Sequence, residues 1–282
     1  MFTKMTLFYT GTSNQRTRFT LKGGSWGTTA YPATVCILEH PLHGTILIDT
    51  GYSLSMKKHM SNLVHAVYRQ VVGAQVVADD LAAHIDPDDV ALVILSHFHP
   101  DHIGSCNAFS KNQVVCSQAI AELAQAHKFK QLRQGYFAGL FPYINDQLSY
   151  IESCPQVEVV GIGTGFDLLG DQSLLALATP GHAVGHYSFL IQTSDGPVLY
   201  GVDAAWHQEA ISEQRYPSAI TKLFIANYQE MIASVHKLET IAKANPQLPI
   251  FFCHCTNSHQ QLAAFFNERG RTDFAIITNN YL

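Results

Sequence analysis

Charged side chains are scarce in this sequence. They make up 14% of its 282 residues, whereas 47% are hydrophobic and 11% are aromatic. This balance excludes an intrinsically disordered chain, because disorder requires many charges and few apolar residues. The 17 lysines and arginines form no dense run and the formal net charge is -5, so we expect no nucleic-acid partner. The apolar content is sufficient for an extensive β-sheet core.

Long hydrophobic runs and an export signal are also missing. No apolar run approaches the roughly 18 residues that a membrane helix needs. The opening stretch "MFTKMTLFYTGTSNQRTRF" has neither a continuous apolar segment nor a small-residue cleavage site. We therefore expect a cytoplasmic protein without a membrane partner.

The six cysteines show no disulfide framework and no Cys-x-x-Cys pair. Reduced, buried thiols that pack as small hydrophobic groups are the simplest interpretation. Cys253 and Cys255 flank His254 in "PIFFCHC", which the sequence predicts to be a strand. Alternate residues of a strand point to opposite faces, so we expect both thiols to face away from this histidine.

Histidine, in contrast, is concentrated in one place. In the stretch "VILSHFHPDHIG" the end of an apolar strand is followed by His97, His99, Asp101 and His102. In an extended segment His97 and His99 point the same way and can converge on one metal ion, while the turn that follows can aim Asp101 and His102 at a second. The alternative is a surface turn that is rich in histidine by chance, but composition makes this pattern rare.

Three further polar residues stand where an apolar strand stops. They are His182 in "ALATPGHAVGH", Asp203 in "PVLYGVD" and His254 in "PIFFCHC". Each alone is more typical of a hydrogen-bonded core or turn residue. Together with the histidine cluster they complete a ligand set for two metal ions.

Strand and helix patterns predict a mixed α/β protein. Two hairpin-like segments, "TVCILEHPLHGTILIDTG" and "YSFLIQTSDGPVLYGVDA", both end in aspartate, which indicates either two similar halves or coincidence. Helices are expected at residues 53–72, 117–128, 221–244 and 259–269. We predict a single domain over residues 1–282. Segments 52–75 and 129–151 are expected to form a wall or lid over the site, with ordinary helix packing or a homodimer contact as the alternative.

The segments "SHFHPDHIG", "TPGHAVGHYSFL", "YGVDAAW" and "FFCHC" together resemble the metallo-β-lactamase superfamily. The resemblance implies a four-layer αββα sandwich, in which two mixed β-sheets face each other, helices lie outside, and two metal ions sit at one edge. It implies a first metal held by His97, His99 and His182, a second held by Asp101, His102 and His254, and Asp203 bridging both. Asp49 in "ILIDTG", Ser96, His186 and Trp206 are candidates for positioning ligands or substrate.

Such a metal pair predicts hydrolysis. Two ions about 3.5–4 Å apart activate a water molecule and polarise the substrate, so no serine or cysteine nucleophile is required. Asp101 and Asp203 are the expected catalytic carboxylates. We expect zinc, although iron, manganese and cobalt suit the same ligands.

Within the superfamily, "IDTG", "SHFHPDHIG" and "TPGHAVGH" resemble the acyl-homoserine lactonases, which implies a small lactone or carboxyl ester as substrate. Only 28 residues follow His254, which disfavours thioesterases with a large C-terminal substrate domain. One departure is Trp206, which stands where the lactonases place a tyrosine, and an indole cannot pass on a proton. Tyr187, Tyr200 and Tyr216 are substitutes by residue type. The alternatives are a phosphodiesterase, a thioesterase, or a metal-binding protein without turnover.

Overall fold

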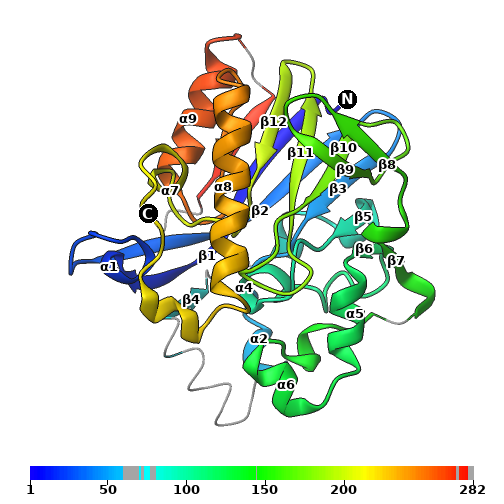
Figure 1. The fold of residues 1–282 in the computed structure, drawn as a ribbon. Helices are drawn as coiled ribbons and strands as arrows, with labels where there is room; N and C mark the ends of the chain where they lie inside the picture. Colours follow the sequence, from blue (N-terminus) through cyan, green and yellow to red (C-terminus); the bar gives the residue numbers. More distant parts are fainter. Residues whose placement is uncertain (60–69, 71–72, 77–80, 144, 271–272, 279–282) are drawn as a thin grey trace.

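The computed structural model describes residues 1–59, 70, 73–76, 81–143, 145–270 and 273–278. Two β-sheets form its centre (Figure 1). The strands of the first sheet, in the order β14-β1-β2-β3-β5-β6-β7 with β4 paired to β1, are β1 (Lys4–Arg16), β2 (Thr28–His40), β3 (Gly44–Ile48), β4 (Ala74–Val76), β5 (Val90–Ile94), β6 (Val114–Cys116), β7 (Leu148–Tyr150) and β14 (Phe274–Ile277).

The second sheet has the order β13-β12-β11-β10-β9-β8. Its strands are β8 (Gln156–Val159), β9 (Gly163–Asp167), β10 (Leu174–Ala178), β11 (Tyr187–Thr193), β12 (Gly196–Tyr200) and β13 (Ile250–Phe251). Both sheets are mixed: β1, β2 and β3 pair antiparallel and β3, β5 and β6 parallel, while in the second sheet only the β12–β13 pair is parallel.

Helices cover the outer faces of the two sheets. The α-helices are α1 (Thr17–Thr20), α2 (Met56–His59), α4 (Pro100–Ile103), α5 (Gln118–Ala124), α6 (Lys128–Arg133), α7 (Glu209–Ser212), α8 (Tyr228–Ala244) and α9 (Thr256–Asn267). Short 3-10 helices lie at Leu81–Ala83, Pro87–Asp89, Ala138–Leu140, Asn145–Gln147, Ile151–Ser153 and Ala219–Leu223. None of the helices in the described part of the chain has the length and apolar character of a membrane span.

Successive side chains of a strand point to opposite faces of its sheet, and this alternation produces the layers of the fold. On β10, Leu174 points into the core between the sheets, whereas Leu175 points outward and packs with Val235 and Leu238 of α8. Buried residues on the other face of the first sheet pack against α5, as Val93 does in one cluster with Ile120. The result is the predicted αββα sandwich, which is confirmed.

The predicted helices are confirmed in part. The predicted helix at residues 221–244 begins later, at Tyr228, because the Asn227 side chain accepts hydrogen bonds from the next two free backbone N–H groups and caps the helix there. The helix expected at residues 117–128 divides into α5 and α6. Of the one expected at residues 53–72, the structure describes α2, and most of the remainder lies outside the described residues.

Candidate metal centre

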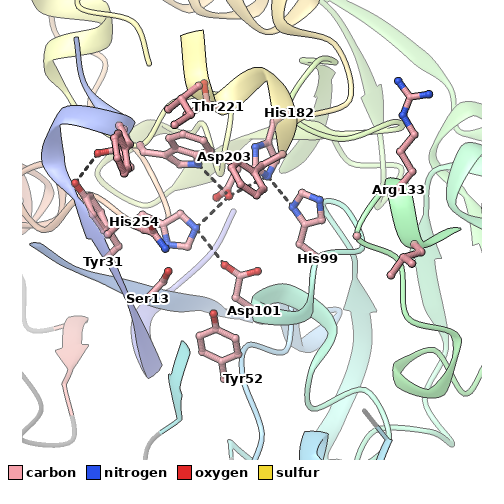
Figure 2. Close-up of a pocket in the computed structure, with 18 residues that line it drawn as sticks. Ser13, Tyr31, Tyr52, His99, Asp101, Arg133, His182, Asp203, Thr221 and His254 are labelled. Carbon is pink, nitrogen blue, oxygen red and sulfur yellow. Dashed lines mark hydrogen bonds and ion pairs between the residues drawn. The ribbon is translucent and has the colours of Figure 1, made fainter. Parts of the chain in front are cut away.

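Seven side chains from distant parts of the sequence meet at one edge of the sandwich. His97, His99, Asp101 and His102 follow β5, and the three others, His182, Asp203 and His254, follow β10, β12 and β13. Each strand is buried and apolar and ends just before its polar residue or a short turn. The structure thus brings together every side chain that the sequence predicted as a metal ligand. Figure 2 shows those that line the cavity.

The first cluster consists of three histidines. His99 Nδ1 lies 3.1 Å from His97 Nε2 and 2.9 Å from His182 Nε2. Ser96 Oγ donates to Asp49 Oδ2 at 2.7 Å, so it must accept from His97 Nδ1 at 3.0 Å. The proton of His97 is therefore on Nδ1 and its Nε2 offers a lone pair to the cluster, as a metal ligand does.

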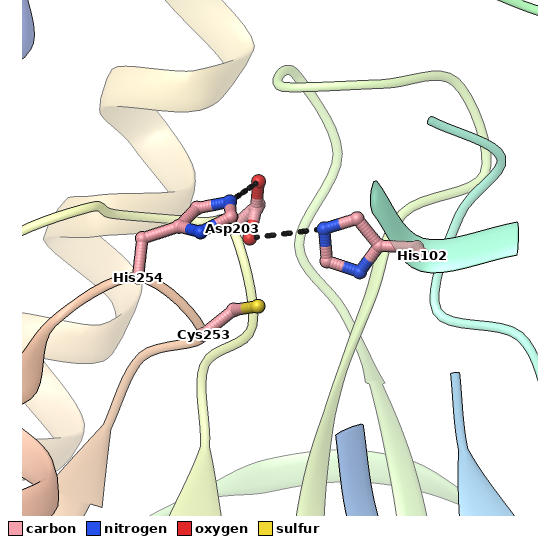
Figure 3. Close-up of side chains that lie close together, drawn as sticks. All are labelled: His102, Asp203, Cys253 and His254. Atoms are coloured by element: carbon pink, nitrogen blue, oxygen red, sulfur yellow. Dashed lines mark hydrogen bonds and ion pairs between the residues drawn. The ribbon is translucent and has the colours of Figure 1, made fainter. Parts of the chain in front are cut away.

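The second cluster contains His102 and His254 (Figure 3). His102 Nδ1 donates to Asp49 Oδ2 at 2.7 Å, and His254 Nδ1 donates to the Pro32 carbonyl at 2.6 Å. Both rings therefore turn Nε2 toward the cluster. His254 Nε2 lies 3.4 Å from Asp101 Oδ2, which places this carboxylate in the same cluster.

Asp203 lies between the two clusters. Its Oδ2 is 3.2 Å from His182 Nε2 and 3.1 Å from His254 Nε2, and its Oδ1 is 3.5 Å from His102 Nε2. Among the described side chains, His102 Nε2 and Asp203 Oδ1 are buried atoms that make no hydrogen bond. Unpaired polar atoms are costly in a protein interior, and a cation between them would satisfy both. The donor set therefore fits two divalent metal ions.

The electrostatics of the site differ between its groups. Burial acts to lower the pKa of His102 and of His254, but the nearby carboxylates, Asp203 above all, outweigh it and raise both pKa values well above the usual value, so these two rings release a proton when they bind a cation. Burial and the neighbouring histidines lower the pKa of His97 well below its usual value, which keeps this ring neutral. Burial acts to raise the pKa of the Asp203 carboxyl, but His254, His102 and His182 outweigh it and hold that pKa well below the usual range. The site thus presents a carboxylate and a neutral imidazole, the forms that bind cations.

Asp49 hydrogen-bonds to residues that position ligands of both clusters. It is fully buried, its Oδ1 accepts from the Ser96 backbone N–H at 2.8 Å, and its Oδ2 accepts from Ser96 Oγ and from His102 Nδ1. Its backbone has φ 66°, a left-handed conformation that is uncommon for residues other than glycine. One carboxylate thereby orients His102 directly and His97 through Ser96.

His186 has a different place from His182. Its Nδ1 donates to the Thr179 carbonyl at 2.9 Å, and its Nε2 accepts from the Asp203 backbone N–H at 3.2 Å. Both ring nitrogens are used, so His186 positions the backbone of Asp203 and offers no lone pair to an ion. Burial lowers its pKa to about 4, which keeps the ring neutral.

The prediction that Cys253 faces away from His254 is wrong. Its Sγ lies within 4.8 Å of the ligand atoms of His102, Asp203 and His254. Strand β13 ends at Phe251, so the alternation of a strand no longer applies at Cys253. The thiol lies beside the Thr34 backbone, accepting from its N–H at 3.4 Å and within 3.6 Å of its carbonyl oxygen.

A cavity of about 510 Å³ opens over the two clusters. Five candidate ligands contribute to its wall: His99, Asp101, His182, Asp203 and His254. Its other lining residues are Ser13, Gln15, Phe19, Thr20, Tyr31, Tyr52, Leu132, Arg133, Gly135, Trp206, Ile220, Thr221 and Phe224. The predicted wall segment 129–151 thus supplies three lining residues, and Trp206 donates from Nε1 to Asp203 Oδ2 at 3.4 Å.

The tyrosines suggested by residue type do not line this cavity. Tyr187 donates to Glu152 at 3.2 Å, Tyr200 donates to the Thr34 carbonyl in the core, and Tyr216 contacts His236. The tyrosines that do line the cavity are Tyr31 and Tyr52, which the sequence interpretation missed. Tyr52 follows "IDTG" directly, so its closeness in sequence to Asp49 could have indicated that it lies near the site.

Comparisons with known proteins agree with this geometry. A model of the metallo-beta-lactamase superfamily matches residues 29–205. The chain is 30% identical over 220 residues to the N-acyl homoserine lactonase AttM of Azorhizobium caulinodans, which covers 75% of this chain and 78% of that protein. It is also 30% identical over 227 residues to an N-acyl homoserine lactonase of a Bacillus species, which covers 78% and 80%.

Solved structures show the same fold. An AiiA variant of B. thuringiensis with N-decanoyl-L-homoserine bound at its active site has a TM-score of 0.69 and 22% identity, over 93% of this chain and 96% of that one. The dizinc quorum-quenching lactonase AidC has a TM-score of 0.56 and 14% identity, over 90% and 89%. From the family match, the sequence identity and the shared fold, the chain belongs to the metallo-beta-lactamase superfamily.

Proposed function

We propose that this protein is a hydrolase that opens a lactone or a small carboxyl ester at a pair of divalent metal ions. The observation that carries the proposal is the position of Asp203, whose carboxylate contacts both ligand clusters at the bottom of the cavity. A carboxylate in this position can hold two ions at the short separation that two-metal hydrolysis requires.

The candidate ligands divide between two sites. The first site would use His97, His99 and His182, the second Asp101, His102 and His254, with Asp203 shared. When bound, two such ions lower the pKa of a water molecule and polarise the acyl oxygen of the substrate. Zinc suits these nitrogen and oxygen donors, and iron, manganese and cobalt do as well.

The chain's own groups provide the remaining functions. Asp101 lines the cavity and lies next to His254, so its carboxylate can accept a hydrogen bond from the attacking water and orient it. Asp49, through His102 and Ser96, keeps two ligand rings in one orientation during turnover.

The cavity walls support a substrate with an apolar part. Phe19, Leu132, Ile220 and Phe224 line the cavity around the candidate metal centre. The cavity volume of about 510 Å³ lies within the range of small-molecule sites. Relatives named N-acyl homoserine lactonase align over three quarters of the chain, which supports an acylated lactone as the substrate class.

A phosphodiester is the second candidate substrate. Arg133 lines the cavity, and a guanidinium group is well suited to bind phosphate oxygens. A cytoplasmic location, a homodimeric state and a single domain over residues 1–282 remain predictions of the sequence.

The test is a substrate panel with purified protein of known metal content. We expect turnover of acylated lactones or alkyl esters, loss of this activity with a chelator, and recovery on adding zinc. Thioesters and phosphodiesters complete the panel. Turnover confined to phosphodiesters would replace the lactone assignment, and two bound ions without turnover of any class would favour a metal-binding protein.

A further inference from the structure

Building on the proposed function, we infer that the hydroxyl group of Tyr52 donates a hydrogen bond to the leaving oxygen of the substrate ester. During hydrolysis the water oxygen bonds to the acyl carbon and releases one proton to solvent. The bond to the leaving oxygen breaks with its electron pair on that oxygen, which then takes up one proton from solvent. A donor aimed at this oxygen stabilises the charge that it gains.

The position of Tyr52 is the first reason. Its side chain lines the cavity and is 3% exposed, so its phenol ring is almost wholly buried. Figure 2 shows the hydroxyl pointing toward Asp101, on the side of the second ligand cluster. A substrate bound over the clusters would therefore meet this hydroxyl.

The rigidity of Tyr52 is the second reason. Its backbone N–H donates to Thr10 Oγ1 at 2.9 Å, and its carbonyl accepts from Ser105 Oγ at 2.9 Å. Strand β1 passes directly over the ring at Gly11, where an added Cβ would lie 3.0 Å from Tyr52 Cδ2. A donor fixed in this way loses little entropy when it meets the transition state.

Four other donors of the cavity wall are less suitable. Trp206 Nε1 donates to Asp203 Oδ2, and Thr221 Oγ1 donates to the Ser218 carbonyl at 2.6 Å. The hydroxyl of Tyr31 lies 2.6 Å from Thr20 Oγ1, and in Figure 2 it points away from Asp101. Ser13 also lines the cavity, but an aliphatic hydroxyl is less acidic than a phenol and therefore a weaker donor.

The experiment compares Tyr52→Phe with the wild-type protein on two esters that share one acyl group. One ester has an alkyl alcohol as leaving group and the other has 4-nitrophenol, which needs little stabilisation when it leaves. We expect kcat for the alkyl ester to fall by about 100-fold, the size of effect seen when one oxyanion donor is removed. For the nitrophenyl ester we expect less than about a threefold loss, with KM and the content of two metal ions unchanged in both cases.

The matched control is Tyr187→Phe, which removes a hydroxyl that donates to Glu152 outside the cavity. It should leave both kcat values unchanged. An unchanged kcat of Tyr52→Phe with an active wild-type protein overturns the inference alone, and so does an equal loss on both esters. A loss of bound metal or of folding in Tyr52→Phe shows that the residue is structural, which also overturns it. A wild-type protein inactive on all esters overturns the proposed function, and the inference with it.

Discussion

Two histidines and an aspartate meet at two places in the part of the chain that the structure describes. One is the candidate metal centre around Asp203, and the other joins His40, His43 and Asp171. In the second cluster Asp171 Oδ2 lies 3.3 Å from His40 Nε2 and 3.5 Å from His43 Nε2. These distances are close to those between Asp203 and its histidines, so the residue types and spacing do not distinguish the two places.

The hydrogen bonds of the other ring nitrogen, Nδ1, do distinguish the two clusters. In the metal centre, Nδ1 of His102 and of His254 donates to a protein oxygen, which leaves Nε2 as the nitrogen that can bind an ion. His40 Nδ1 instead accepts from two backbone N–H groups, those of Leu42 and His43. Its Nε2 lies 3.0 Å from the Met1 ammonium group and 3.3 Å from Asp171 Oδ2.

Both ring nitrogens of His40 are consequently engaged by groups of the protein. Burial and the neighbouring N-terminal amine lower its pKa, which keeps the ring neutral. The comparison teaches that the partner of the outer nitrogen sets which nitrogen His102 and His254 can offer to an ion. Three predictions test it, and a fourth concerns a buried histidine outside the metal centre.

The largest effect is expected for Asp203→Ala. Losing the carboxylate shared by the clusters leaves two cations unscreened from each other, so bound metal should fall below two ions per chain. Activity should fall by more than about 100-fold, which exceeds the loss of activity expected when a residue that only hydrogen-bonds to a metal ligand is removed. Metal analysis and steady-state kinetics measure both, and Asp171→Ala is the matched control that keeps both ions. Equal metal loss in the two variants would remove the distinction between the clusters.

A comparable effect is expected for His182→Ala, and a smaller one for His186→Ala. His182 offers Nε2 to the first cluster, whereas His186 has both nitrogens bonded to the protein. We expect His182→Ala to lose metal. We expect His186→Ala to keep its metal and to lose at most about 10-fold in activity, which is the smallest loss typical for a residue that only positions a metal ligand. Metal titration of the two variants side by side is the measurement. Equal losses would mean that the wrong histidine was assigned.

Asp49→Asn changes the outer partner without touching the cavity. The amide keeps the size of the side chain, but its NH₂ group cannot accept the protons of His102 and Ser96 that the carboxylate accepts. We expect metal affinity or activity to fall by about 10- to 100-fold. Competition with a chelator gives the affinity directly. Full affinity in this variant would show that the orientation of His102 does not depend on Asp49.

The smallest effect concerns pH and a buried histidine outside the centre. His259 Nε2 donates to the Phe252 carbonyl at 2.7 Å, and Nδ1 accepts from Tyr9 at 2.6 Å. Burial lowers the pKa of His259 to about 4, below its ordinary value near 6.5. Between these values the unfolded chain binds more protons, so stability is lost as the pH falls from about 6.5 toward 4.

Urea unfolding at pH 7.5 and pH 5 measures this contribution. The wild-type protein and His259→Gln are compared at one metal concentration, so that the ligands contribute equally to both. We expect the difference in unfolding free energy between the two pH values to be smaller in the variant. An identical pH dependence would mean that His259 is not held neutral by the fold.

The elements that could be predicted share one property: their signal is local. The strand before His97 and the ends of the strands before Asp203 and His254 are visible as apolar runs that stop at a polar residue. The fold class followed from the same motifs through the resemblance. The position of Cys253 could not be predicted, because its strand ends two residues earlier than the apolar run does.

The sequence by itself determined which residues are able to bind metal ions and in what order they come, because their types and their places at strand ends are written along the chain. Only the tertiary structure decided which nitrogen each histidine turns toward the site, since that depends on acceptors such as Asp49 and Pro32 that are distant in sequence. The same holds for Tyr52, whose hydroxyl reaches the cavity through contacts with Thr10 and Ser105 that are distant in sequence.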